Sequence, residues 1–580
     1  MAPGLLKDEL RAEHADDVLE TVAEYAKQVP KADETGYVIP DTYLGARRPI
    51  KVLVIGFGAA AINIVHAIGQ RKDNNVVIQC YEKNDEVGGT WYENKYPGCA
   101  CDIPAVNYMF SWHSKPDWTS YYATSQEILG YFKDIVEKHG MQQYVKLRHA
   151  VSGAWWNGET GKWRIKIVPD GNQDAAFYDE GEVLINATGV LNNWKWPAVP
   201  GVEKFQNKVH SAAWDDSVDL DDKVVGIIGN GSSAVQIIPA IFPRIKKIIS
   251  YQRSSTWITA GFAQKYAGEN GANFNYTEDQ KKEFAADPAK YLEYRKLVEE
   301  ELNQRFKFII NGSAEQAEAL AYARLEMGRK LQGREDLISK MVPTNYAVGC
   351  RRPTPGNGYL ECLTNQEKCE VTFAPIKEIT EEGIVTTDGV LRKVDVLVCA
   401  TGFDVSFRPR YPIVGQGSID LRDAWKEQPY TYLSATVPDF PNYFMINGPF
   451  GPYGHGSILP VIEIITRYLE RFVEKLQTEN VKSFAPKMDA VEDFRRHREL
   501  FLKRTAWSSP CRSWFKGGKV DGPIMMWPGS RLHFFEAMAK PRYEDYNWEY
   551  RDTNRFSYFG NGFSQREVDG SDISWYINGV

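Results

Sequence analysis

Two glycine-rich loops constrain the fold of this chain more than any other feature. The first, Gly-Phe-Gly-Ala-Ala-Ala at 56–61, follows a short apolar strand expected at 51–55 and opens an apolar helix. The second, Gly-Asn-Gly-Ser-Ser-Ala at 229–234, follows a strand expected at 223–228 and opens another. A further apolar strand comes after each helix, which completes the βαβ unit that binds dinucleotides. The chain therefore predicts two dinucleotide-binding units, about 173 residues apart.

Both loops have the parts that a pyrophosphate needs. Glycines permit a tight turn and a close approach of the backbone, a small residue lets the helix pack on the strand, and the helix N-terminus offers free N–H groups. The residues predicted to bind the first cofactor in this way are Gly56, Gly58 and Ala61. For the second cofactor they are Gly229, Gly231, Ser232 and Ser233.

The residue at the end of the second strand distinguishes the two units. Glu82 ends that strand in the first unit, where a carboxylate accepts hydrogen bonds from both ribose hydroxyls. Arg253 and Ser254 stand there in the second unit, and an arginine matches the charge of a 2′-phosphate that a carboxylate repels. The first unit therefore suits FAD and the second suits NADPH.

Composition excludes several classes of partner. The net charge is -7, the pI is about 5.9 and no block of Lys or Arg occurs, which argues against a nucleic-acid partner. No run of 18 apolar residues exists, and the acidic start lacks a secretory signal, so we expect no membrane association. Eight scattered cysteines fit reduced thiols in a cytoplasmic enzyme, and Cys99 and Cys101 lack the spacing of a metal site.

A chain of 580 residues predicts several domains, here of α/β class with two Rossmann-like dinucleotide-binding domains. The expected division is an N-terminal extension, the first part of the FAD domain, an NADP domain and a returning segment of the FAD domain with a C-terminal loop region. The boundaries are 1–48, 49–200, 201–390 and 391–580. A charged, helix-periodic stretch at about 270–345 predicts a helical insertion in the NADP domain.

One segment adds a specific resemblance. Residues 89–102 read Gly-Thr-Trp-Tyr-Glu-Asn-Lys-Tyr-Pro-Gly-Cys-Ala-Cys-Asp, with a Gly-x-Trp, an aromatic-Pro-Gly and an Asp four positions later. In this the chain resembles the Baeyer–Villiger monooxygenases, class B flavoprotein monooxygenases, and most closely their fungal members with an N-terminal extension. The resemblance covers nearly all of 50–550. It implies that the cofactor site includes Gly89, Thr90, Trp91, Tyr96 and Asp102.

Other segments extend the resemblance, with one departure. The linker after 187–189 carries His210 and Trp214 at the family's spacing, but Asn207 replaces a glycine and the interval from Phe205 to His210 is one residue short. We interpret His210 as an element of domain motion. The resemblance further assigns Arg351 to the NADPH phosphate, beside Arg253 and Ser254, and Trp514 to a late loop against NADP.

The resemblance also implies a reaction. NADPH reduces the flavin, O2 forms a C4a-peroxyflavin, and a ketone becomes an ester or lactone, with sulfoxidation as a side activity. Arg352 is the expected catalytic residue, because arginine stays protonated and donates several hydrogen bonds to an anionic oxygen. Asp102 is expected to pair with it, orienting the guanidinium and letting it swing between positions. Arg352 and Asp102 are also expected to contact cofactor.

Three alternatives stay open at this stage. A flavin monooxygenase that oxidises amines or thioethers has the same two loops, but Trp214, Arg352 and residues 89–102 favour a ketone. A disulfide or quinone reductase needs a redox cysteine pair that the first domain lacks, and a redox-sensing scaffold would bind no flavin. The expected partners are a small ketone and O2, and the expected state is a monomer or weak oligomer.

Overall fold

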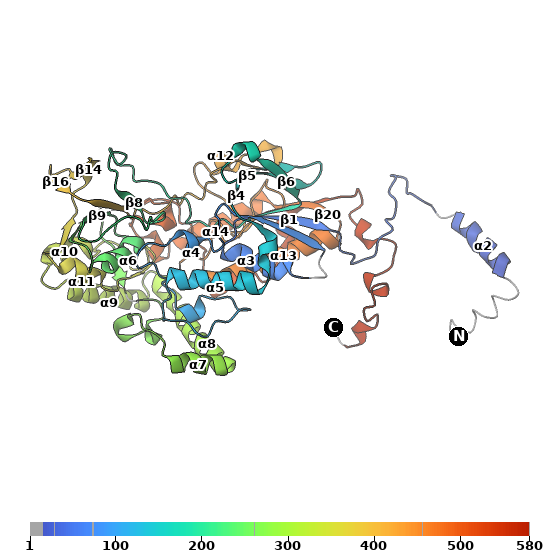
Figure 1. Ribbon diagram of the computed structural model, residues 1–580. Coiled ribbons are helices and arrows are strands. Elements are labelled where there is room, and N and C mark those ends of the chain that lie inside the picture. The colour runs from blue at the N-terminus through green and yellow to red at the C-terminus, as the bar shows by residue number, and fades with distance from the viewer. Residues whose placement is uncertain (1–14, 28–29, 72–74, 260, 455, 579–580) are drawn as a thin grey trace. The chain divides into compact units, whose positions relative to one another are not determined.

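The computed structural model describes residues 15–27, 30–71, 75–259, 261–454 and 456–578 (Figure 1). Two compact units divide the chain. The larger comprises residues 49–473 and 483–547, and the smaller comprises the described part of 1–48 together with 474–482 and 548–578. Both glycine loops lie in the larger unit.

The first glycine loop belongs to a five-stranded sheet in the order β19-β7-β1-β2-β3. Every pairing in it is parallel. Its strands are β1 (Ile50–Ile55), β2 (Val76–Tyr81), β3 (Val145–Lys146), β7 (Val183–Asn186) and β19 (Tyr443–Met445). The central strands are continuously apolar because both faces of the sheet are covered.

Figure 1 shows helices α3 (Ala59–Ile64) and α5 (Ser125–Lys138) on one side of β1 and an antiparallel sheet on the other. That second layer is formed by β4 (His149–Asn157), β5 (Lys162–Pro169), β6 (Phe177–Gly181) and β18 (Ile413–Val414), where β18 pairs parallel with β4. Leu53 of β1 packs against Trp163 and Ile165 of β5, all of them buried.

The second glycine loop belongs to another parallel sheet, in the order β13-β10-β9-β17-β8. Its strands are β8 (Lys208–His210), β9 (Val224–Ile228), β10 (Lys247–Tyr251), β13 (Cys369–Thr372) and β17 (Val396–Cys399). Helices α6 (Ser232–Ile241) and α11 (Tyr359–Thr364) share a core with β9 and β10. The sheet of β14 (Ile376–Ile379), β15 (Gly383–Thr386) and β16 (Leu391–Lys393) shares another core with β10 and β17. The expected α/β fold with two Rossmann-like units is confirmed.

One expected assignment is wrong. The strand after residue 391 was expected to return to the first sheet, but β17 pairs with β9 and β8 in the second sheet. The return to the first sheet comes only at β19, which pairs with β7. The error arose because a buried parallel strand has the same continuous apolar pattern in either sheet.

Four helices occupy the stretch expected to be a helical insertion. They are α7 (Glu278–Ala286), α8 (Pro288–Gln304), α9 (Ala314–Lys330) and α10 (Glu335–Met341). Thr277 caps α7 with a complete capping box, and Asp287 caps α8 ahead of a proline in its first turn. Met327 of α9 and Met341 of α10 join the core of the second sheet.

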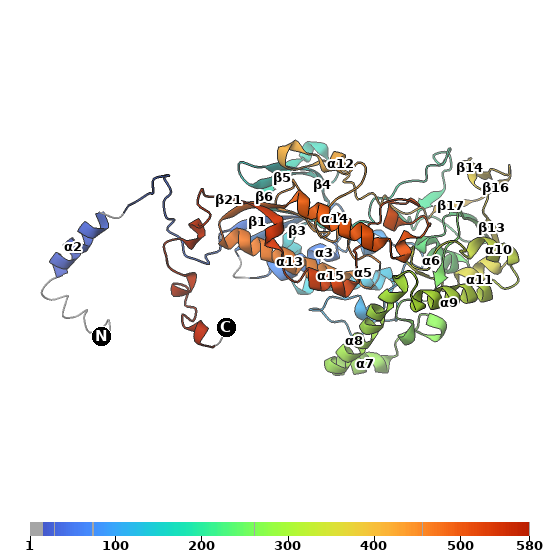
Figure 2. The same cartoon turned by 180° about the vertical axis from the view of Figure 1, so that it is seen from behind.

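The other described elements are shorter or lie late in the chain, as Figure 2 shows for α13 to α15. They are α2 (Ala15–Lys27), α4 (Thr90–Glu93), α12 (Leu421–Ala424), α13 (Ile458–Thr478), α14 (Met488–Leu502), α15 (Arg531–Ala537), β11 (Ile258–Thr259), β12 (Thr354–Pro355), β20 (Val481–Pro486) and β21 (Tyr546–Tyr550). In the smaller unit, the backbone of Leu44 bonds to Phe563 and Gln565. No helix among the described residues is long and apolar enough to cross a membrane.

The expectation that all cysteines are reduced thiols is wrong for two of them. Cys350 and Cys511 form a disulfide across 161 residues of sequence, and the other six are free. Spacing in the sequence could not reveal this pair, because only the fold brings the two segments together. Disulfides are rare in reducing compartments, so this pair weakens the argument for a cytoplasmic location, which stays a prediction.

Candidate functional site

The first glycine loop lines a cavity of about 650 Å³. Gly56 has a φ of +98°, and a Cβ there would lie 3.0 Å from the carbonyl oxygen of Ala187. A Cβ on Gly89 would lie 3.1 Å from the Cα of Gly58, so these two backbones are in direct contact. The loop therefore presents bare backbone to the cavity, as a bound pyrophosphate requires.

Glu82 is held beside this loop at the end of β2. Its carboxylate accepts hydrogen bonds from the backbone N–H groups of Phe57 (2.7 Å) and Asn84 (2.9 Å). Burial raises the pKa of Glu82, and these two hydrogen bonds oppose the rise. The carboxylate lines the cavity with further acceptor capacity for the hydroxyls of a ribose.

The second loop repeats this construction. Gly229 has a φ of +119°, and a Cβ there would lie 2.4 Å from the carbonyl oxygen of Ala400. In each dinucleotide-binding unit, the carbonyl that lies against the first glycine of the loop belongs to an Ala-Thr-Gly segment. This segment is 187–189 in the first unit and 400–402 in the second. This repeated contact explains why each loop begins with a glycine.

Arg351 and Ser254 meet beside the second loop. A terminal nitrogen of Arg351 donates to Ser254 Oγ (3.2 Å), and Asn230 of the loop donates to the Ser254 carbonyl (2.7 Å). The pKa of Arg253 is lowered, first by burial and then by the charges of Arg512 and Arg351. The sequence assigned Arg253, Ser254 and Arg351 to a phosphate, but it did not identify Arg512.

Asp102 and Arg352 form a two-bonded ion pair on the cavity wall. Nε of Arg352 donates to one carboxylate oxygen of Asp102 (2.6 Å) and a terminal nitrogen to the other (2.9 Å). The third nitrogen donates to the carbonyl of Tyr453 (3.1 Å), and the guanidinium lies over the ring of Phe262. Burial opposes the charge of Arg352, but Asp102 outweighs it and raises the arginine pKa. These three hydrogen bonds hold the guanidinium in this orientation.

The aromatic-Pro-Gly segment connects the two dinucleotide-binding units, both of which lie in the larger compact unit. Tyr96 donates to the side chain of Gln236 (2.8 Å), and Gln236 donates to the carbonyl of Ala100 (3.0 Å). A Cβ on Gly98 would lie 2.6 Å from the Gln236 carbonyl, so only glycine permits this approach to α6. No sequence pattern singles out Gln236, because a glutamine on an apolar helix has no distinguishing spacing.

Two more positions on the cavity wall bear on a ligand. Asn447 Oδ1 is buried and has no hydrogen-bond partner among the described residues. An orphaned buried acceptor is costly unless a ligand donates to it, which fits a flavin ring. Trp514 also lines the cavity, with its ring 5.6 Å from that of Tyr453.

His210 lies in the linker strand β8 and is fully buried. Nδ1 accepts from the backbone N–H of Ala212 (3.1 Å), Nε2 lies 3.1 Å from Thr401 Oγ1, and the ring stacks on Trp194. Burial lowers the pKa of His210 to about 4, so the imidazole is neutral near pH 7. Thr401 belongs to the segment that contacts the second loop, which links His210 to that loop.

The structure separates the predicted residues into two groups. Those that line the large cavity are Gly56, Gly58, Glu82, Gly89, Thr90, Trp91, Tyr96, Asp102, Ser232, Arg352 and Trp514. Those that lie outside its lining are Ala61, Gly229, Gly231, Ser233, Arg253, Ser254 and Arg351. Within the described part of the chain, no group of three or more His, Cys, Asp or Glu residues could hold a metal ion.

Comparison with known proteins identifies the family. The model of the flavin-binding monooxygenase-like family matches residues 49–317. The FAD-binding monooxygenase tazF of Aspergillus terreus is 38% identical over 539 residues, which cover 91% of this chain and 95% of that protein. The FAD-binding monooxygenase stcW of Emericella nidulans is 34% identical over 567 residues, which cover 95% of this chain and 93% of that protein. The chain belongs to the flavin-binding monooxygenase-like family.

Solved structures with the same fold include cyclohexanone monooxygenase from Rhodococcus sp. Phi1 bound to NADP+. It is 25% identical, with a TM-score of 0.74, over 87% of this chain and all of that one. The OTEMO complex with FAD and NADP is 22% identical, with a TM-score of 0.74, over 86% of this chain and 99% of that one. The second likeness concerns the fold alone.

Proposed function

We propose that this protein is an NADPH-dependent flavoprotein monooxygenase of the Baeyer–Villiger type, which converts a ketone to an ester or lactone with O2. The observation that carries the proposal is the Asp102–Arg352 ion pair on the wall of the large cavity. A permanent cation facing a flavin-sized cavity suits a reaction in which negative charge develops on oxygen. The cyclohexanone monooxygenase fold and the family membership support the same conclusion.

The residues present fit both cofactors. The bare loop at Gly56, the Glu82 carboxylate and the unpartnered Asn447 oxygen would hold FAD. The loop at Gly229 and the cationic group beside Ser254 would hold NADPH. FAD, when bound, supplies the transfer of a hydride from NADPH and the activation of O2.

The chain's own residues have three tasks in this reaction. Arg352 stabilises the negative charge that develops on the ketone oxygen when its carbonyl carbon is attacked. Asp102 is a positioning residue, because its two hydrogen bonds fix the guanidinium plane. Trp514 and Tyr453 cover the cavity with aromatic rings and exclude water from it.

The balance of the reaction is one ketone, one O2, one NADPH and one proton in, and one ester, one NADP+ and one water out. The proposal covers linear, cyclic and polyketide ketones. Sulfoxidation is proposed as a side activity. The division into a FAD domain, an NADP domain and an N-terminal extension also stays a proposal, with the second sheet extended to include β17.

The alternative is a flavin monooxygenase that oxidises nitrogen or sulfur. The deciding experiment incubates the purified yellow protein with NADPH, O2 and a panel of linear, cyclic and aryl ketones, one thioether and one tertiary amine. Mass spectrometry of the products then identifies the reaction. An ester or lactone heavier than its ketone by one oxygen supports the proposal. Sulfoxide or N-oxide with every ketone unchanged would overturn it and favour the alternative.

A further inference from the structure

Three arginines from three distant segments gather at the second glycine loop. Arg253 lies two residues after strand β10, and Arg351 donates to its neighbour Ser254. Arg512 belongs to the late segment, and its charge lowers the Arg253 pKa more strongly than that of Arg351 does. Among the residues that the structure describes, no carboxylate lies within 4.0 Å of the charged nitrogens of these three. Three converging cations without an acid form a site for a multiply charged anion.

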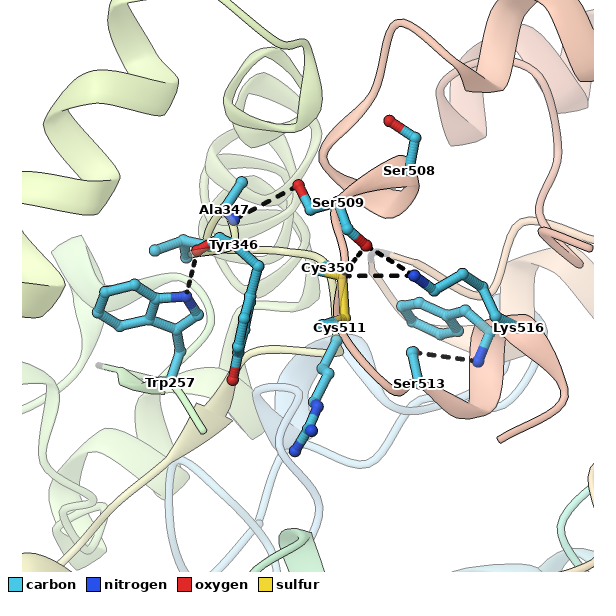
Figure 3. The surroundings of a disulfide bond; sticks show 12 residues. Trp257, Tyr346, Ala347, Cys350, Ser508, Ser509, Cys511, Ser513 and Lys516 are labelled. Carbon is cyan, nitrogen blue, oxygen red and sulfur yellow. Dashed lines mark hydrogen bonds between the residues drawn. A yellow bond between two sulfur atoms is a disulfide. The ribbon is translucent and has the colours of Figure 1, made fainter. Parts of the chain in front are cut away.

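A disulfide joins two of these three segments. Cys350 directly precedes Arg351, and Cys511 directly precedes Arg512, so one covalent bond joins the backbones that carry both arginines. Figure 3 shows the surrounding contacts. The backbone N–H of Ala347 donates to Ser509 Oγ (3.4 Å).

A fourth cation, Lys516, lies beside the disulfide. Lys516 is buried, and its ammonium donates to the Ser509 carbonyl (2.7 Å) at 4.0 Å from Cys350 Sγ (Figure 3). Burial, together with the charge of Arg351, lowers the pKa of Lys516, against the opposing charge of Asp521. The positive charges of Arg351, Arg512 and Lys516 repel one another, and the disulfide opposes the separation of the two segments that carry them.

We propose that Arg512 is a further ligand of the NADPH 2′-phosphate, and that the Cys350–Cys511 disulfide is the positioning element that brings it to Arg253 and Arg351. The 2′-phosphate is the group that the three arginines fit, because the rest of NADPH carries no other dianion beyond the pyrophosphate at the loop. The disulfide keeps the mutually repelling arginines assembled while the cofactor is absent. This inference depends on the proposed use of NADPH.

The test compares NADPH with NADH, which lacks the 2′-phosphate. Flavin reduction in the holoenzyme is followed anaerobically by loss of the yellow colour, and the half-saturating concentration is determined for each cofactor. Arg512→Gln is expected to raise the value for NADPH about tenfold or more, with the value for NADH unchanged. Arg253→Gln serves as the positive control. Arg504→Gln, an exposed arginine before the disulfide, serves as the matched negative control.

The outcomes separate the two proposals. If NADPH does not reduce the wild-type flavin, the proposed function fails and this inference fails with it. If Arg253→Gln loses its NADPH preference but Arg512→Gln keeps it, only this inference is overturned. If Arg512→Gln raises the half-saturating concentrations of NADPH and NADH equally, Arg512 has a merely structural role and this inference is also overturned.

The disulfide is tested separately. Thiol titration of the denatured protein without reductant should find six free thiols out of eight cysteines. The double variant Cys350→Ser/Cys511→Ser is expected to lose NADPH preference in the same direction as Arg512→Gln, whereas Cys362→Ser, at a free cysteine, is expected to keep it. A count of eight thiols, or a double variant with wild-type preference, would remove the disulfide from the proposal.

Discussion

The substitution Asp102→Asn tests how much the ion pair contributes to oxygenation. Asparagine has nearly the same shape but no charge, so Arg352 loses its counter-ion while the packing stays. The two side chains are 20% and 25% exposed, which places the pair between an exposed pair, at up to about 1 kcal/mol, and a fully buried one, at 3–5 kcal/mol. We therefore assign about 2 kcal/mol to the loss of orientation.

If this free energy is lost in the transition state for oxygenation, kcat/KM for the ketone falls about 30-fold. The assay measures ester formation at saturating NADPH and, separately, anaerobic reduction of the flavin by NADPH. Reduction is expected to stay near the wild-type rate, because the phosphate site and both glycine loops are unchanged. Asp279→Asn, whose side chain is 97% exposed, is the matched control and should leave both rates unchanged.

A wild-type rate of ester formation by Asp102→Asn would refute the positioning role of Asp102. An equal loss in reduction and oxygenation would also contradict it, because that result indicates damage to cofactor binding rather than to the orientation of Arg352.

Three more predictions follow from the site. Arg352→Ala should keep its flavin and its reduction by NADPH but form ester at least about 100-fold more slowly, and ester at the wild-type rate would remove Arg352 from the mechanism. Gly56→Ala should purify with little flavin, because its φ of +98° and the Ala187 carbonyl at 3.0 Å leave no room for a Cβ, whereas Gly130→Ala, with open space around it, should keep a full complement. The buried His210 has a pKa of about 4 against an ordinary 6.5, so the unfolded chain takes up this proton first and stability is lost as the pH falls from 6.5 towards 4. By pH 5.5 the loss in unfolding free energy is on the order of 1 kcal/mol, and in denaturant titrations of His210→Gln the unfolding free energy should depend on pH less by that amount.

Much of the site was predictable because its residues follow strand ends. The glycine loops and Glu82 come directly after short apolar strands, and Arg253 comes two residues after one. The carboxyl ends of parallel strands meet at one edge of a sheet. The resemblance carried by residues 89–102 supplied Asp102 and its expected partner, and the structure joins the two in an ion pair.

The remaining features depend on contacts that no local pattern encodes. Gln236 and Gly98 meet only because α6, in the second dinucleotide-binding unit, approaches the segment after Tyr96 in the first. The Cys350–Cys511 pair spans 161 residues, and Arg512, the residue after Cys511, acts electrostatically on Arg253 although the two are distant in the sequence. The strand β17 was misplaced because its apolar pattern suits a buried position in either sheet.

The most direct test of the central claim is mass spectrometry of the product formed from a ketone under ¹⁸O2, with the purified holoenzyme and NADPH. The account predicts an ester or lactone with one ¹⁸O atom, placed between the carbonyl carbon and the carbon that migrated, with one NADPH consumed for each product. Unchanged ketone together with labelled hydrogen peroxide, across the full panel of ketones, would contradict it.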